Sequence, residues 1–276
     1  MKKAYFIKCH GLGNDFVIFL ENNNFKITEN LIKNLSDRKK GIGCDLVVFL
    51  KKPEEDYLDL ETRFFNKDGS EAEICGNALR CIGKYFLDKL KKDNATIETK
   101  AGLIDIEKIS NQLIAVDIGK PNLKWKKIPL SMDIETSNLG LNFNYLKGGF
   151  AVNVGNPHVI FFVKKIDKNK LEIDVKEIED IGLFPKGVNV SVVNVVSDQE
   201  INVLTFERGV GITSACGTGA GASAYASYKL KHCANKITVR MYGGNLDVEI
   251  TKDDHILTIG ESNEVFRGEI NVEEYL

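Results

Sequence analysis

The stretch ICGNALRC, from Ile74 to Cys81, places a cysteine and a glycine directly before a run that is typical of a helix. A second stretch of the same kind, ACGTGAGA, runs from Ala215 to Ala222. Because glycine and a small polar residue follow each cysteine, the backbone at the start of both predicted helices is accessible next to a thiol. The chain therefore carries the same helix start twice, and Cys216 lies 141 positions after Cys75.

Other parts of the chain are repeated as well. Asn66 and Glu207 each lie nine residues before a cysteine. Further blocks recur in the same order at a nearly constant offset: GNDFVIF (13–19) with GNPHVIF (155–161), GCDLVV (43–48) with GVNVSV (187–192), and GLIDIE (102–107) with GNLDVE (244–249). Agreement at this many places indicates a duplication, so that each half forms one structural unit.

The secondary-structure pattern predicts an α+β fold. Short β-branched runs separated by turn residues predict many strands. Four segments predict helices: 28–39, 73–92, 174–183 and 215–231. The helices that begin at the cysteines are the most apolar, so we expect two pseudosymmetric domains, each a curved, mostly antiparallel sheet wrapped around one central helix.

The domain boundaries follow from the repeat. We expect an N-terminal domain of residues 1–120, to which 262–276 cross back, and a C-terminal domain of residues 121–261. The segment 121–149 has weak periodicity and many turn residues, and it is interpreted as a linker. Ligand sites commonly lie between domains, so we expect the active site in the interdomain cleft.

Composition excludes several classes of protein. The formal net charge of −2 over 276 residues lacks the basic excess of a nucleic-acid-binding protein. Polar residues interrupt the apolar N-terminal segment, so we expect no signal peptide there. No later run approaches the roughly 20 apolar residues of a membrane span. We expect a cytoplasmic protein that acts on a small molecule, without nucleic-acid or membrane partners.

The six cysteines are expected to be reduced thiols. Their spacing matches no metal signature, so no metal site is predicted. Small buried side chains are expected for the four outside the helix starts, Cys9, Cys44, Cys81 and Cys233. Arg80 is interpreted as a surface partner of its helix.

A thiol at a helix N-terminus has a defined chemistry. The unpaired N–H groups and the positive end of the helix dipole favour the thiolate. The amides of Gly76, Asn77, Gly217 and Thr218 could bind a carboxylate. Two opposed thiols could then remove a proton from one face of a carbon and return one to the other face, which is a two-base inversion.

Inversion at the α-carbon of an amino acid usually requires a pyridoxal cofactor held by a lysine. No lysine here stands in such a context, so no cofactor is expected. Hydrogen bonds to the carboxylate and exclusion of water would then stabilise the carbanion.

Several motifs resemble those of the diaminopimelate epimerase family of pyridoxal-independent amino-acid epimerases. They are HGLGNDFVIF, FFNKDGSEAEICGNALRC, ETKAG, VGNPH, GVNV and FERGVGITSACGTGA, and the resemblance runs from about Lys8 to Gly260. It implies an isomerase that interconverts L,L- and meso-diaminopimelate in the synthesis of lysine and peptidoglycan precursors, with Cys75 and Cys216 as acid and base.

The resemblance also implies the substrate contacts. They fall on Asn14, Asn66, Asn156, Asn189, Glu207 and Arg208, with backbone contacts from Gly76, Asn77, Gly217 and Thr218, and His158 beside the thiols. These residue types suit a substrate with two amino-acid ends. Arg208 can hold a distal carboxylate bidentately, Glu207 can accept hydrogen bonds from an ammonium group, and asparagines can both donate and accept.

Two positions depart from the common pattern of the family, Leu46 and Ile212. A changed site could accommodate another side chain, so a related histidine racemase is the alternative. A thiol redox-switch protein that uses Cys75 and Cys216 is an alternative of another class, although it would not need the surrounding asparagines, Glu207 and Arg208. A homodimer is a further expectation.

Overall fold

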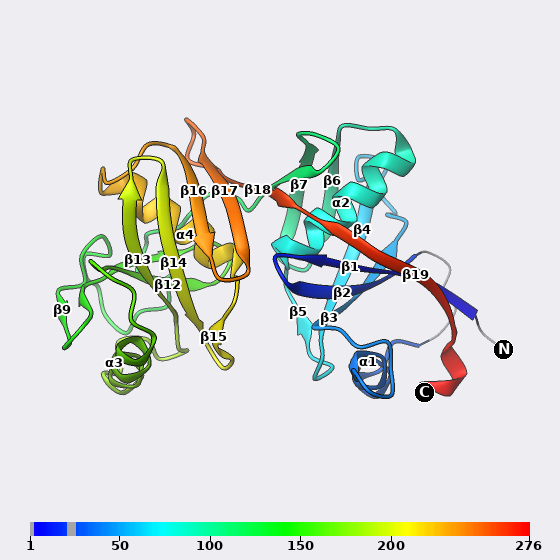
Figure 1. Cartoon of the computed structure of the whole chain (residues 1–276), viewed down its shortest axis with the longest axis horizontal. Coiled ribbons are helices and arrows are strands. Elements are labelled where there is room, and N and C mark those ends of the chain that lie inside the picture. The colour runs from blue at the N-terminus through cyan, green and yellow to red at the C-terminus, as the bar shows by residue number, and fades with distance from the viewer. Residues whose placement is uncertain (1–2, 21–25) are drawn as a thin grey trace. The chain divides into compact units, whose positions relative to one another are not determined.

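The computed structural model describes residues 3–20 and 26–276, which form two compact units (Figure 1). Unit 1 comprises Met1–Val116 and Gly260–Leu276, and unit 2 comprises Asp117–Ile259. The chain therefore leaves unit 1 after Val116 and returns to it for its C-terminal segment.

Unit 1 contains two helices, α1 (Glu29–Ser36) and α2 (Gly76–Leu90), among its described residues. Its strands are β1 (Lys3–Gly11), β2 (Asn14–Phe19), β3 (Leu46–Lys51), β4 (Leu60–Asn66), β5 (Glu71–Ala72), β6 (Asn94–Thr99), β7 (Gly102–Lys108), β8 (Leu113–Asp117, whose last residue belongs to unit 2) and β19 (Asn263–Asn271). A short 3-10 helix, Val272–Glu274, follows β19.

Unit 2 contains α3 (Lys168–Asp180) and α4 (Gly217–Lys229). Its strands are β9 (Leu141–Asn142), β10 (Lys147–Gly148), β11 (Phe150–Asn153), β12 (Pro157–Phe162), β13 (Asn189–Ser197), β14 (Glu200–Glu207), β15 (Gly211–Thr213), β16 (Lys236–Met241), β17 (Gly244–Ile250) and β18 (Ile256–Glu261, which continues into unit 1). Helix α3 begins six residues earlier than the sequence predicts, because Asp167 caps its N-terminus and accepts a hydrogen bond from Lys170 N.

The two units share one topology, as the repeat predicts. In unit 1, β2 and β3 pair in parallel, β3 and β4 antiparallel, β4 and β6 in parallel, and β6 and β7 antiparallel. In unit 2 the same sequence of pairings joins β12, β13, β14, β16 and β17. The last long strand, β19, adds to unit 1 by antiparallel pairing with β1.

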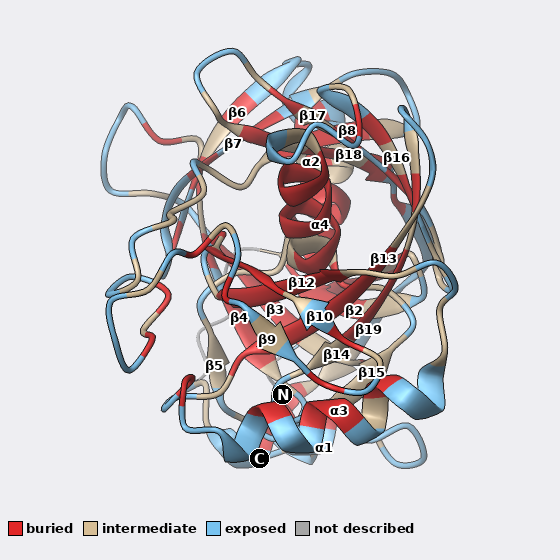
Figure 2. Ribbon diagram, turned by 90° about the vertical axis from the view of Figure 1, so that its left-hand side faces the viewer, coloured by how far each residue is buried: buried red, intermediate tan, exposed pale blue. Residues whose placement is uncertain are grey.

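Helices α2 and α4 lie at equivalent positions after the matching strands, and each is the central helix of its unit. Nine consecutive residues of α4, from Gly219 to Ser227, are buried, which makes α4 a red helix enclosed by strands in Figure 2. A helix apolar on every side is stable only inside a core. Alanine and glycine predominate in α4, so the strands can approach its backbone closely.

The segment 121–149 is not a linker, although its sequence was interpreted as one. Ile128, Leu139, Phe143 and Leu146 are buried in the same hydrophobic cluster as Phe161 on β12. The interpretation failed because these apolar residues are spaced for neither a helix nor a strand, and irregular chain can still contribute to a core. The structure therefore places the whole segment in unit 2.

The four cysteines outside the helix starts are buried, which confirms the prediction. Cys9, Cys44 and Cys81 are each at most 3% exposed, and Cys233 is 9% exposed. In addition, no helix in the described part of the chain has both the length and the hydrophobicity that crossing a bilayer requires.

A charge network anchors β2 in unit 1. Asp15 accepts hydrogen bonds from Lys8 Nζ at 2.6 Å and from two nitrogens of Arg38 at 2.9 and 2.7 Å. Burial opposes ionisation of Asp15, but the hydrogen bonds from Arg38 and Lys8 outweigh it and hold the pKa of this carboxyl well below its ordinary value. The spacing along the chain does not predict this network, because Lys8 and Arg38 lie 7 and 23 residues from Asp15.

We predict that Asp15→Asn destabilises the protein by about 2 kcal/mol at pH 7, because charged hydrogen bonds are lost and the buried Lys8 loses its counter-charge. Since the folded-state pKa of Asp15 is lowered, its contribution to stability is complete above pH 3.8, the ordinary pKa of the carboxyl. The contribution is lost as the pH falls below 3.8. Urea unfolding at pH 7 and at pH 3 measures the change. Asp56→Asn, at an exposed aspartate, is the control; an equal loss at both pH values would contradict the prediction.

Candidate active site

Helix α2 begins at the first predicted catalytic cysteine. Cys75 is the N-cap residue, with φ −142° and ψ 105°, and its thiol makes no capping bond to the helix. The sulfur instead lies 3.8 Å from Asn14 Oδ1. A side chain added at Gly76 would meet no atom of the protein within 4 Å, so the first turn of α2 is open to a ligand on that side.

Asn14 begins β2 and Asn66 ends β4, the two strands that flank β3 in unit 1. Asn14 Nδ2 donates to Asp45 Oδ2 at 3.0 Å, which fixes the amide that Cys75 contacts. Asn66 Nδ2 donates to Ser70 Oγ at 3.0 Å. Leu46 is the direct register partner of Asn66 between β3 and β4, so the two side chains share one face of the sheet. The departure at Leu46 therefore lies beside a predicted substrate contact.

Helix α4 begins at the second predicted catalytic cysteine, with a tighter cap. Cys216 Sγ accepts a hydrogen bond from Gly219 N at 3.3 Å and lies 3.5 Å from Thr218 Oγ1. A Cβ at Gly219 would lie 2.7 Å from Thr205 Oγ1 and 3.2 Å from Cys216 Sγ. Glycine is therefore required at position 219. Since the sulfur takes the third N–H of the helix, the amides of Gly217 and Thr218 remain as the anion-binding groups of the first turn.

The acidity of Cys216 differs from the sequence-based expectation. The helix N-terminus was expected to favour the thiolate, yet burial, followed by the negative charge of Glu207, raises the pKa of Cys216 to about 12. Hydrogen bonds from Thr218 and Gly219 lower this pKa, but they do not offset burial. Cys216 is therefore a neutral thiol near pH 7.

His158 lies at the centre of a hydrogen-bonded network in unit 2. Its side chain is fully buried, and Nε2 lies 2.9 Å from Asn156 Oδ1, 3.1 Å from Thr218 Oγ1 and 3.5 Å from Asn189 Nδ2. Burial, followed by the positive charge of Arg208, lowers the pKa of His158 to about 3. The imidazole therefore stays neutral at physiological pH. Its contact with Thr218 links β12 to the first turn of α4, beside Cys216.

Glu207 and Arg208 close this network at the end of β14. Thr213 Oγ1 donates to Glu207 Oε1 at 2.6 Å. Arg208 donates from its backbone N to Asn189 Oδ1 at 2.9 Å and from Nη1 to Lys186 O at 2.6 Å. A Cβ at Gly187 would lie 2.7 Å from Arg208 Cδ, so glycine, at φ +70°, makes space for the arginine stem.

The structure thus brings the predicted residues into two groups. Unit 2 unites Asn156, His158, Asn189, Glu207, Arg208, Cys216, Gly217 and Thr218. Unit 1 places Cys75, Gly76 and Asn77 at the start of α2 with Asn14 in contact, whereas Asn66 bonds within its own turn. Sequence reasoning missed Asp45 and Thr213, which hold Asn14 and Glu207. Asp45 is the last residue of the stretch GIGCD (41–45), and this motif is the sequence signal that could have identified it.

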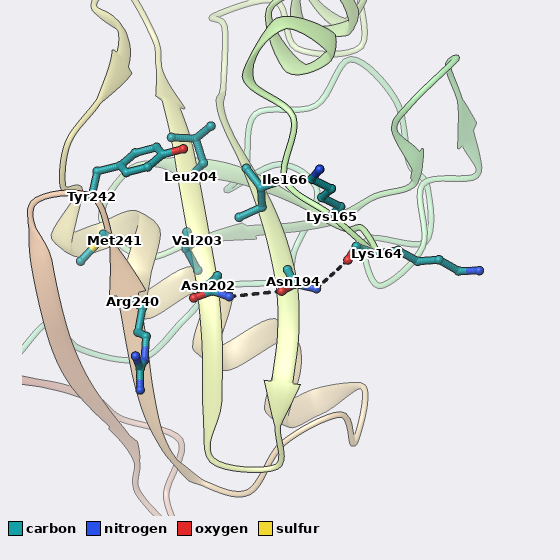
Figure 3. Close-up of a pocket in the computed structure, with 10 residues that line it drawn as sticks. All are labelled: Lys164, Lys165, Ile166, Asn194, Asn202, Val203, Leu204, Arg240, Met241 and Tyr242. Carbon is teal, nitrogen blue, oxygen red and sulfur yellow. Dashed lines mark hydrogen bonds between the residues drawn. The ribbon is translucent and has the colours of Figure 1, made fainter.

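A cavity of about 370 Å³ in unit 2 contains none of the predicted residues (Figure 3). Asn202 on β14 donates to Asn194 on β13 across it, at 3.2 Å. Other lining residues include Lys164, Lys165 and the exposed Tyr242. No nucleophile or buried acid lines it, so its chemistry does not resemble that of the cysteine sites.

The fold is that of a known class of racemases and epimerases. A hydroxyproline epimerase from Agrobacterium vitis superposes with a TM-score of 0.67 at 12% identity, and the match covers 98% of this chain and 92% of the other. A PhzF-family phenazine biosynthesis protein from Bacillus anthracis superposes with a TM-score of 0.68 at 18% identity, over 98% and 100% of the two chains.

The family is shown by sequence. The family model for diaminopimelate epimerase matches residues 6–124 and 150–265. The diaminopimelate epimerase of Carboxydothermus hydrogenoformans is 40% identical, covering 96% of this chain and 98% of that protein. That of Methanocaldococcus jannaschii is 38% identical, covering 95% and 96%. The chain belongs to the diaminopimelate epimerase family.

Proposed function

We propose that the protein is a diaminopimelate epimerase that interconverts the L,L and meso isomers without a cofactor, within lysine biosynthesis. One observation carries this proposal: a cysteine is the N-cap residue of the corresponding central helix in both units. Family membership supports the substrate. We propose that the two half-sites act on one substrate molecule in the cleft predicted between residues 1–120 with 262–276 and residues 121–261.

The half-sites supply complementary binding groups. The first-turn amides of Gly76, Asn77, Gly217 and Thr218 would bind the carboxylate next to the reacting carbon, because helix N-termini favour anions. Glu207 would accept hydrogen bonds from the reacting ammonium. Arg208 and the asparagines Asn14, Asn66, Asn156 and Asn189 would hold the distal amino-acid end.

The inversion needs one thiolate and one thiol. The thiolate removes the α-proton, and the electron pair left on carbon is delocalised into the carboxylate, where the helix amides stabilise the developing charge. The opposite thiol then donates its proton to the other face of the carbon. His158 holds Thr218 and the start of α4 in place as a neutral hydrogen-bonding group.

Exchange with solvent tests the function directly. The reduced protein in D₂O is expected to exchange the α-hydrogen of L,L-diaminopimelate, seen as loss of its NMR signal, without added pyridoxal phosphate. L-Histidine, offered separately, is expected to keep its α-hydrogen. Exchange of histidine alone would favour the related racemase and make Leu46 and Ile212 specificity determinants; a stable signal from both would reject the function.

We further propose a cytoplasmic homodimer. Tyr5, Val265 and Phe266 on the paired strands β1 and β19 are 63%, 55% and 47% exposed, and we propose that a partner subunit covers these apolar side chains. The thiol cycle requires reduced cysteines, which the cytoplasm maintains. Sedimentation velocity measures the oligomeric state, and a single monomeric species would contradict the dimer. Cell fractionation tests the location.

A further inference from the structure

Arg80 on α2 is the largest fully buried side chain among the described residues, and it is not the surface residue that the sequence suggested. Its Nη2 donates a hydrogen bond to Asn77 Oδ1, one helical turn nearer the N-terminus. Nε and Nη1 are buried without a hydrogen-bond partner, and in the described chain no carboxylate lies within ion-pair distance of Arg80. A buried cation without a counter-charge is costly, so its retention needs an anion that forms during function.

The anion is found among the thiols. Burial is the largest influence on Arg80 and lowers its pKa to about 10, while the negative charges that Cys81 and Cys75 would carry oppose this effect. Cys81 is itself buried and hydrogen-bonds Cys9, and its pKa is raised well above the ordinary value. Arg80 reaches back to Asn77, two residues after Cys75 at the start of α2, and Cys75 is the partly exposed one of the two thiols.

Charged groups on the elements packed against α2 do not compensate Arg80. These elements are β1, β2, β6 and β7, and β19 also contacts α2 through Arg267, which lies over the Tyr85 ring and pairs with Glu264. On β1 and β2, Lys8 and Asp15 bind each other, Cys9 contacts Cys81, and His10 carries no fixed negative charge. The inward residues of β6 and β7 are uncharged. Glu98, Asp105 and Glu107 are exposed, and the partly exposed Lys108 pairs with Asp88.

Unit 2 has the opposite arrangement at the matching positions. The residue 141 positions after Arg80 is Gly221, where a Cβ would lie 2.7 Å from Ile118 Cδ1, so no side chain fits there. The residue that matches the neutral Asn66 is Glu207, whose charge acts on Cys216. At the first pair of positions, unit 1 therefore has a cation where unit 2 has a glycine. At the second pair, unit 1 has a neutral amide where unit 2 has a carboxylate.

We propose that Arg80 is a positioning residue that keeps Cys75 ionised in the free enzyme, so that Cys75 begins the cycle as the base and Cys216 as the acid. This inference rests on the proposed function and adds to it the resting protonation state of the pair. The substrate isomer whose α-hydrogen faces Cys75 then reacts with the resting enzyme directly.

Alkylation of variants that keep only one of the two predicted catalytic cysteines tests the proposal without turnover. Iodoacetamide labelling, followed by peptide mass mapping between pH 5 and 10, is applied to Cys216→Ala and to Cys75→Ala. Cys75 in the first variant is expected to react at least about 100-fold faster at pH 7 than Cys216 in the second, given the opposite local charges. Equal rates, or faster labelling of Cys216, would overturn the proposal.

Arg80→Met separates an electrostatic role from a structural one. Replacing an unpaired buried cation by an apolar side chain of similar length is expected to leave the melting temperature equal or higher. In the Cys216→Ala background it should slow Cys75 labelling at pH 7 by about 10- to 100-fold and move its pH profile upward. In the Cys75→Ala background, Cys216 labelling should not change. Arg80→Lys, which keeps the charge, should restore most of the Cys75 rate.

Two controls complete the test. Arg240→Met removes an exposed arginine of unit 2 and should alter neither labelling rate. If Arg80→Met does not fold, the pH profile of Cys75 labelling in the Cys216→Ala variant still decides the proposal, because a midpoint at or above the ordinary thiol value of about 8.5 would overturn it. Because labelling needs no substrate, fast Cys75 labelling in a protein without epimerase activity would reject the proposed function alone, and an active epimerase with slow Cys75 labelling would reject this inference alone.

Discussion

Cys75→Ala and Cys216→Ala are each expected to lower the rate of diaminopimelate epimerisation by about 10³- to 10⁴-fold, because each removes the only proton carrier on one face of the substrate. The fold should survive both changes. Cys75 makes no capping bond, so its loss should cost little, whereas Cys216 caps Gly219 N and its loss should cost about 1 kcal/mol. Circular dichroism and an epimerase assay with either isomer measure the two effects.

The half-reaction distinguishes a proton carrier from a structural thiol. Each single variant keeps one of the two predicted catalytic thiols. It should therefore exchange the α-hydrogen of only one isomer with D₂O, slowly and without inversion. The two variants should differ in which isomer exchanges. Cys233→Ala, at a buried free cysteine of unit 2 outside the site, is the matched control and should retain full activity. An active Cys75→Ala enzyme would remove the two-base assignment.

Arg208→Lys is expected to lower kcat/KM for diaminopimelate by about 10- to 100-fold, mainly through a higher KM. Arg208 already donates from Nη1 to Lys186 O, and its remaining donors can form the bidentate contact to the distal carboxylate. The single ammonium group of a lysine cannot keep both contacts. Steady-state kinetics in both directions measures the change.

The control for Arg208 is Arg240→Lys, because Arg240 is an exposed arginine of unit 2 whose partner is Glu200. It should leave KM unchanged. An unchanged KM in Arg208→Lys would show that the distal carboxylate is bound elsewhere. A fall in kcat with constant KM would instead place Arg208 at the reacting end of the substrate.

The sequence by itself determined the repeat and the place of the two thiols. Local patterns carry this information: the glycines after Cys75 and Cys216, the apolar helices that follow them, and the matching strand blocks. The helix starts are found where the pattern predicts them, with each cysteine at the N-cap. Such features depend on residues within one or two turns of each other, so they can be recognised without a structure.

Only the tertiary structure decided the charge state of the site and the surroundings of its residues. Cys216 is a weak acid because strands distant in sequence bury it and because β14 brings Glu207 to its side. Arg80 is buried because the sheet of unit 1 closes over the face of α2 that carries it. Burial and charge act through space, including between residues that lie far apart along the chain, and spacing in the sequence does not record them.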